Sequence, residues 1–195
     1  MKKIIIIAIL LFSIASCKQK TIFIQKEVPN GYSILVPDYL QPCADLHKDA
    51  SLQFQNVEED IYALVIDEKK VTMQANGLYF TLDEYYKNIV SQPFLETIKD
   101  VKVSIPGRQK INGNPALITE MTGKVDKNEV FYKMGLIETP YEFYQILIWT
   151  RGDNKEKFEP DMTKMIESFK ELPHPPEELP TPKLSDSVSI VPAYK

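Results

Sequence analysis

Residues 45–49 carry the side chains whose types and spacing come closest to a metal site. Asp45, His47 and Asp49 alternate along this segment, so an extended backbone would direct all three side chains to the same side. One imidazole nitrogen and two carboxylate oxygens make a ligand set that divalent metals accept. A solvated loop shows the same pattern, with a lone histidine between acids that binds nothing. We favour the loop and expect no metal site.

Cys43 is a candidate nucleophile, because a thiol can attack carbonyl or phosphoryl groups. Such chemistry requires a base beside the thiol and a third group that orients the base, whereas Cys43 has only His47 nearby in the sequence. No G-x-S-x-G, H-E-x-x-H, Walker or G-x-G-x-x-G pattern occurs in the chain. We therefore interpret Cys43 as a partly buried free thiol, and expect no catalytic residues, no cofactor and no enzymatic activity.

Two charged clusters are candidate ion sites. The run Glu58-Glu59-Asp60 could attract a cation, and Arg108 with Lys110 beside Gly107 could hold an anion in a turn of backbone N–H groups. Charged runs more often form a solvated hairpin tip or a hydrated turn. We favour the solvated interpretation for both.

Aromatic residues are a stronger indication of function than the charges. They gather around residues 79–86 and 141–149, and Tyr and Trp are enriched where proteins bind partners. Most of them must belong to the core, but an exposed group would form a binding groove. The candidate partner-binding residues are Tyr79, Tyr86, Tyr141 and Tyr144.

The N-terminus contains the most specific motif of the chain. Lys2 and Lys3 precede an apolar stretch that is too short to span a bilayer, and Ile-Ala-Ser leads to Cys17. This tetrad resembles the bacterial lipobox, in which the cysteine sulfur receives a diacylglyceryl group and cleavage follows before the cysteine. We predict a signal peptide over residues 1–16 and a lipid anchor on Cys17. Several acyl chains, at about 0.8 kcal/mol for each buried CH₂, make such attachment effectively permanent.

The charge balance excludes nucleic acid as a partner. The chain has 23 basic and 27 acidic residues, and removal of Lys2 and Lys3 with the leader leaves 21 basic residues. A nucleic-acid-binding face needs clustered Lys and Arg to neutralise phosphates, and no such cluster is present. Once Cys17 is acylated, Cys43 has no cysteine left with which to form an intramolecular disulfide.

Hydrophobic periodicity predicts one α+β domain over residues 31–172. Alternating or continuous apolar runs predict strands at residues 32–36, 52–55, 61–66, 101–105, 115–125, 129–138 and 141–150. Short connections between the last three favour an antiparallel meander. We expect a central antiparallel sheet of about six strands, flanked by helices.

Two helices are predicted to cover this sheet. Thr81 and Glu84 have capping-box spacing at the start of the first, and a second short turn is expected at residues 94–98. The last helix has Pro160 in its first turn, and its apolar stripe ends at Phe169. Residues 17–30 are interpreted as the lipidated cysteine and a tether. Residues 173–195 hold six of the 14 prolines and are predicted to form a disordered tail.

Three local motifs stand out: an apolar strand that ends in proline, Tyr32-Ser33-Ile34-Leu35-Val36-Pro37; a glycine-proline turn, Gly113-Asn114-Pro115-Ala116; and the end of the last helix, Met165-Ile166-Glu167-Ser168-Phe169. They resemble the opening strand, the "G-x-P-A" hairpin and the closing helix of the PsbP-like superfamily, which includes the Ran-binding Mog protein and the bacterial DcrB-like lipoproteins. The resemblance spans roughly residues 28–172 and implies an α/β/α sandwich. It implies no chemistry, since members of the superfamily act as binding, assembly or chaperone-like accessory proteins.

Two functions remain open. The favoured one is a non-catalytic binding or accessory module, anchored to a cell-envelope membrane through Cys17 and holding a protein or peptide partner. In a Gram-negative source, the outer membrane is expected rather than the inner. The alternative is a carrier of a small apolar ligand in a cavity between sheet and helices. An exposed aromatic groove would favour the first, and a closed apolar cavity the second.

Overall fold

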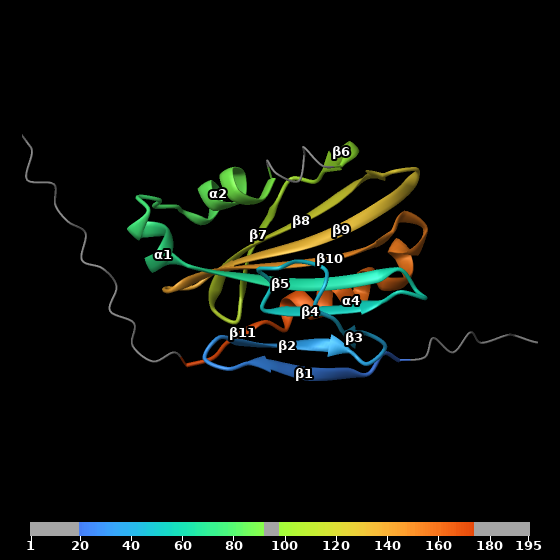
Figure 1. The fold of residues 1–195 in the computed structure, drawn as a ribbon, viewed down its shortest axis with the longest axis horizontal. Helices are drawn as coiled ribbons and strands as arrows, with labels where there is room; N and C mark the ends of the chain where they lie inside the picture. Colours follow the sequence, from blue (N-terminus) through green and yellow to red (C-terminus); the bar gives the residue numbers. More distant parts are fainter. Residues whose placement is uncertain (1–19, 92–97, 174–195) are drawn as a thin grey trace, which may run out of the picture.

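The computed structural model describes residues 20–91 and 98–173, and these form two antiparallel sheets with a helix packed between them (Figure 1). The helix is α4 (Lys155–Glu167), which contacts strand β2 of the smaller sheet and strands β9 and β10 of the larger one. The predicted signal peptide, Cys17 and the Pro-rich tail from residue 174 lie outside the described residues, as does most of the predicted turn at 94–98.

The large sheet contains eight strands rather than about six. It runs in the order β3-β4-β5-β10-β9-β8-β6, and β7 also pairs with β8. Its strands are β3 (Gln41–Pro42), β4 (Leu52–Asn56), β5 (Ile61–Lys69), β6 (Lys99–Val103), β7 (Gly107–Ile111), β8 (Asn114–Val125), β9 (Asn128–Glu138) and β10 (Glu142–Arg151). The predicted meander is confirmed as β8, β9 and β10, which pair in sequence order.

The small sheet corrects two expectations. Strand β1 (Phe23–Val28) lies within the predicted tether, and it pairs along its whole length with β2 (Tyr32–Pro37). The turn between them places Asn30 in the left-handed region at φ 58°, which asparagine tolerates. The short strand β11 (Lys170–Glu171) pairs with the other edge of β2. Strand β2 therefore belongs to a separate sheet, and the folded part begins well before residue 31.

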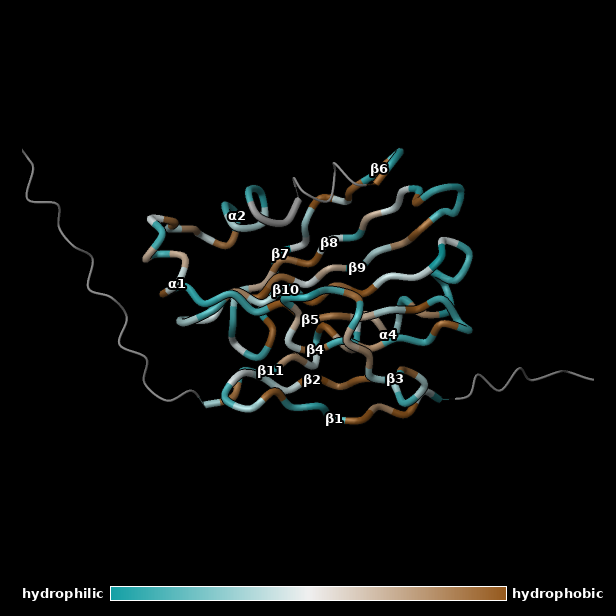
Figure 2. The backbone as a smooth tube through the Cα atoms, in the orientation of Figure 1, coloured by the Kyte–Doolittle hydropathy of each residue, from teal (hydrophilic) through white to brown (hydrophobic). Residues whose placement is uncertain are grey.

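Each face of the large sheet carries its own core. On one face, side chains of β5, β9 and β10 pack against β2 and α4, with the largest fully buried groups being Tyr32, Phe131, Tyr144 and Phe169. On the other face, Phe143 and Leu136 pack under Met73, Leu82 and Tyr85 of the short helices. Figure 2 shows hydrophobic residues concentrated along β2 and the central strands of the large sheet. The expected α/β/α arrangement thus holds only in part, because the small sheet shares one face with α4.

The helices differ from their predicted bounds. The capping box of Thr81 and Glu84 is confirmed at the start of α2 (Leu82–Tyr85), which continues as the π-helix η1 (Tyr86–Ser91). An unpredicted helix, α1 (Lys70–Ala75), follows β5 directly. After the 3₁₀ turn η2 (Gly152–Asn154), α4 begins at Lys155, so Pro160 lies inside the helix rather than in its first turn. Its predicted stripe is confirmed, because Met162, Met165, Ile166 and Phe169 are all buried.

Candidate functional site

The four tyrosines proposed for partner binding do not form one groove. Tyr79 is 63% exposed, and Tyr86 is half-buried against the core beneath α2. Tyr141 is half-buried in the turn before β10, where its carbonyl accepts a hydrogen bond from the Lys70 backbone N–H at 2.8 Å. Tyr144 is 0% exposed and packs against Tyr32 and Phe169 in the opposite core. Its assignment as a partner-binding residue is wrong, and only Tyr79 is a well-exposed ring.

A partly buried polar cluster joins α2 to the large sheet. The Tyr85 hydroxyl donates to a Glu68 carboxylate oxygen, and the Gln145 side-chain amide donates to the same oxygen at 3.1 Å and to the Tyr85 hydroxyl at 2.7 Å. Burial, followed by the bond to Glu68, raises the pKa of Tyr85 above its ordinary range. The three side chains bond to one another, so the cluster holds α2 on the large sheet.

The candidate ion sites are engaged in local structure. His47 Nδ1 accepts from the Asp49 backbone N–H at 3.2 Å, and within residues 20–91 and 98–173 no three His, Cys, Asp or Glu side chains could hold a metal ion. Arg108 reaches both carboxylate oxygens of Asp83 at 2.6 Å. Burial, and next the nearby Asp45, raise the pKa of the Cys43 thiol, which lowers its thiolate content and its reactivity.

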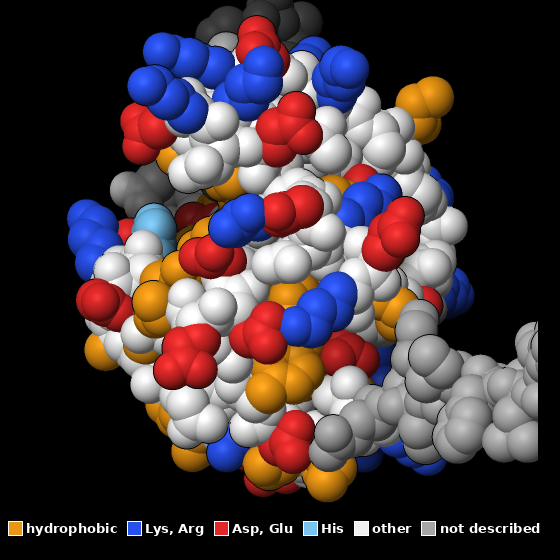
Figure 3. All heavy atoms as spheres, turned by 90° about the vertical axis from the view of Figure 1, so that its right-hand side faces the viewer, with side chains coloured by type: hydrophobic (Ala, Val, Ile, Leu, Met, Phe, Trp, Pro, Cys, Tyr) orange, Lys and Arg blue, Asp and Glu red, His pale blue; other side chains and the backbone are white. Residues whose placement is uncertain are grey.

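An open cleft of about 1040 Å³ lies at the end of the molecule where β1 begins (Figure 1). Four segments line it. Two are residues 20–22, directly before β1, and residues 38–39, directly after β2. The others are Asn56 with Glu59, near the β4–β5 turn, and residues from Asp153 to Asp161. Figure 3 views this end of the molecule, where acidic, basic and hydrophobic side chains are intermixed. Sequence patterns missed the cleft, because only the tertiary fold brings these segments together.

Asp161 joins three of these segments. Its Oδ2 accepts hydrogen bonds from the Thr21 hydroxyl at 2.8 Å and from the Tyr39 hydroxyl at 3.0 Å. Burial, and then the charge of Asp161, raise the pKa of Tyr39 above its ordinary range, so this phenol stays protonated and acts as a donor. A backbone hydrogen bond also fixes the segment that contains Thr21, because the carbonyl of the next residue, Ile22, accepts from the Asp38 backbone N–H at 2.9 Å.

The charges around the cleft are only partly paired. Lys157 forms an ion pair with Glu59, and its Nζ lies 4.7 Å from the centre of the Phe158 ring. Asp153 pairs with Arg151. Among the residues that the structure describes, Asp38 and Glu156 form no ion pair. Five acidic and two basic residues line the cleft, so its charge is negative.

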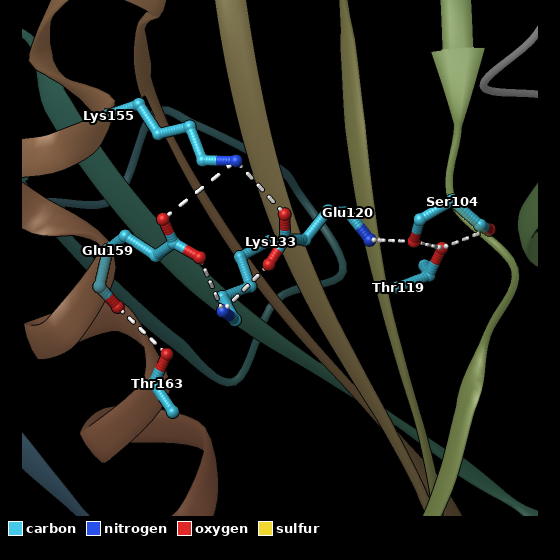
Figure 4. Close-up of polar contacts among 7 residues, drawn as sticks. All are labelled: Ser104, Thr119, Glu120, Lys133, Lys155, Glu159 and Thr163. Atoms are coloured by element: carbon cyan, nitrogen blue, oxygen red, sulfur yellow. Dashed lines mark hydrogen bonds and ion pairs between the residues drawn. The ribbon is translucent and has the colours of Figure 1, made fainter.

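A second network fixes α4 and, with it, the wall of the cleft (Figure 4). Lys133 of β9 is only 7% exposed, and its Nζ lies 3.0 Å from Glu120 Oε1 and 3.3 Å from Glu159 Oε1. Lys155 lies 3.1 Å from Glu120 Oε2. Burial opposes ionisation of Glu120, but the bonds from Lys133 and Lys155 outweigh it and lower its pKa. The carboxylates of Glu120 and Glu159 therefore balance the charge of buried Lys133, and these ion pairs hold α4 against the large sheet.

The helix also approaches the sheet closely at Gly135. A β carbon at this position would overlap the Ile166 side chain, so only glycine allows α4 to lie this near β9.

Within the described residues, no helix is long and apolar enough to cross a membrane.

Comparison with known proteins supports the fold but no activity. No protein-family model matches the chain, and no curated protein matches it in sequence. Cyanobacterial PsbP (CyanoP) from Synechocystis sp. PCC 6803 is similar with a TM-score of 0.59 at 13% identity, covering 83% of this chain and 99% of that chain. LpqN, involved in cell envelope biogenesis of Mycobacterium tuberculosis, is similar with a TM-score of 0.56 at 9% identity, covering 79% and 91%. The chain has a PsbP-like fold.

Proposed function

We propose that this protein is a lipid-anchored cell-envelope lipoprotein, and that it acts without catalysis as a binding or accessory module for another protein. The observation that carries the proposal is the place of the cleft. Its first lining residues, Lys20 and Thr21, follow the predicted lipidated Cys17 almost directly. A bound partner would therefore be held close to the membrane surface.

The chain length between anchor and domain sets that distance. The Thr21 hydroxyl is hydrogen-bonded to Asp161 of α4, which fixes this residue to the domain. The four residue steps from Cys17 to Thr21 span at most about 14 Å of extended chain. Strand β11 (Lys170–Glu171), near the end of the described chain, lies towards the opposite end of the molecule (Figure 1). Anchoring through Cys17 would turn the cleft towards the membrane and the C-terminal end away from it. In a Gram-negative source we expect the outer membrane.

The form of the cleft favours a protein partner over a small apolar cargo. A carrier requires an enclosed apolar cavity that removes its ligand from water. This cleft opens to solvent and is lined by five carboxylates. An apolar ligand would remove water from these carboxylates without replacing its hydrogen bonds, at a cost of roughly several kcal/mol. LpqN, with the same fold, is involved in cell envelope biogenesis, which agrees with an accessory role in the envelope.

Site-specific photo-cross-linking in membranes tests the proposal. A photoreactive amino acid replaces Glu156, an exposed residue of the cleft, in the full-length lipidated chain; matched chains carry it at Tyr79 or at Lys127. Lys127 is an exposed residue of the β8–β9 turn and serves as the control. We expect a discrete protein adduct at Glu156 that is absent at Lys127 and decreases in the Cys17→Ser background. Adducts that are equal at Glu156 and Lys127, or absent from both Glu156 and Tyr79, would contradict the proposal.

A further inference from the structure

Within the part of the chain that the structure describes, Asp161 is a carboxylate without a positive partner. Both of its hydrogen bonds come from neutral hydroxyls, those of Thr21 and Tyr39, and both reach Oδ2. Its other oxygen, Oδ1, accepts no hydrogen bond from any residue of the described chain. Two neutral donors stabilise the anion in place but leave its charge uncompensated, and such a group attracts a cation.

The two lysines with the right helical spacing are both directed elsewhere. Lys157 lies four residues before Asp161, at a spacing suited to an ion pair, but it pairs with Glu59 across the cleft. Lys164 lies three residues after Asp161, and its Nζ lies over the Phe23 ring at 3.9 Å. The chain therefore supplies cations on either side of Asp161 and uses neither of them to neutralise it.

The surroundings of Asp161 fit a long cationic side chain. The rings of Tyr39 and Phe158 lie 5.6 Å apart at the cleft, and Pro160 and Ile22 add apolar surface. Lysine and arginine bury their aliphatic stems along such surface while the charged head reaches a carboxylate. Asp38 and Glu156, which form no ion pair within the described residues, supply further negative charge for neighbouring basic residues.

The size of the cleft indicates a peptide segment rather than a single ion. Its volume of about 1040 Å³ is at the upper end of small-molecule sites and has room for several residues. The described residues also hold no group of three ligands that could bind a metal ion.

We infer that the cleft binds a basic, extended segment of the partner protein, and that the Asp161 carboxylate receives a lysine or arginine side chain of that segment. This inference rests on the proposed function and names the chemistry of the partner. Electrostatic attraction of this kind makes binding dependent on ionic strength.

Titration with a defined peptide tests the inference. The probe is an acetylated and amidated hexapeptide of alternating lysine and alanine, and the protein is the full-length lipidated chain in phosphatidylcholine nanodiscs. Asp161→Asn removes the charge but keeps an oxygen for Thr21 and Tyr39. We expect wild type to bind the peptide, with an affinity that falls as salt rises, and Asp161→Asn to bind about tenfold more weakly or worse. Asp38→Asn, at an exposed residue whose side chain makes no hydrogen bond in the described chain, should weaken binding by a smaller factor.

Two controls keep the outcomes distinct. Glu167→Gln makes the same charge change at an exposed position at the end of α4 and should leave the affinity unchanged. A peptide with norleucine in place of lysine should not bind. Equal affinities of wild type and Asp161→Asn, at equal melting midpoints, would overturn the role of Asp161, and no binding by wild type would overturn the basic ligand. The proposed function fails separately, through the absence of a cross-linked adduct at both Glu156 and Tyr79.

Discussion

The hydroxyl of Tyr39 donates a hydrogen bond to Asp161 at 3.0 Å, and this contact joins the segment after β2 to the middle of α4. The small sheet and the helix are thereby held together at the cleft. Because Thr21 donates to the same oxygen, the first described residues are fixed to the domain as well. The geometry of the cleft therefore depends in part on this carboxylate.

Tyr39→Phe tests that dependence. The substitution removes a hydrogen bond to a charged acceptor but keeps the ring against Phe158, so the free energy of unfolding should fall by about 1 to 3 kcal/mol. Urea unfolding measures the change. Tyr79→Phe makes the same chemical change at an exposed ring and should have no measurable effect. Equal stabilities of wild type and Tyr39→Phe would mean that the contact does not hold the segments together.

Alkaline pH should destabilise the fold. Burial is the largest cause that raises the pKa of Tyr32, Tyr39, Tyr85 and Tyr144, and each keeps its proton more tightly when folded than when unfolded. Their contribution to stability is therefore complete below the unfolded tyrosine pKa of about 10 and is lost as the pH rises above it. Urea unfolding on either side of that pH should show a falling free energy of unfolding, accompanied by tyrosinate absorbance on unfolding. Full tyrosinate absorbance in the still-folded protein near that pH would contradict the burial of these hydroxyls.

Truncation of the central strands should be costly. Leu64 and Ile148 lie on adjacent paired strands and are 4% and 0% exposed, so changing either to Ala should cost about 2 to 5 kcal/mol. Ile105→Ala is the control, because this side chain is 94% exposed and should contribute little. Thermal unfolding of the three variants provides the comparison. Melting midpoints that match wild type for both Leu64→Ala and Ile148→Ala would contradict the packing of the large sheet.

The C-terminal boundary of the fold can be tested by shortening the chain. The Phe169 ring stacks on Tyr32 with centroids 5.5 Å apart, β11 pairs with β2, and the Leu172 backbone N–H donates to the Gly31 carbonyl at 2.9 Å. A chain ending at Leu172 should therefore keep the melting midpoint of the full chain, whereas one ending at Glu167 should unfold without cooperativity. A strong loss of stability in the chain ending at Leu172 would show that residues beyond it are needed.

Local signals in the sequence predicted elements whose formation depends on near neighbours. The capping box of Thr81 and Glu84 is an example, since both partners lie within one helical turn. Strand β7 gave no signal because four of its five residues are exposed, and β1 gave none because charges interrupt its apolar residues. The start of α4 was placed too late because its first turn is polar apart from Phe158.

The candidate site was harder to predict than the fold. Strand alternation contained the information to exclude Tyr144, because it shares a face of β10 with Ile146 and Ile148, both buried. The cleft had no such signal. Thr21, Tyr39 and Asp161 are separated by up to 140 positions, and nothing in their local sequence indicates that they meet.

The most direct test of the central claim is mass spectrometry of the mature protein isolated from membranes, since the proposed anchor at Cys17 would place the cleft at the membrane surface. We predict that the mature chain begins at Cys17 and carries a diacylglyceryl thioether, and that Cys17→Ser yields an unprocessed or soluble species without it. A mature wild-type protein with an unmodified Cys17 would contradict the account.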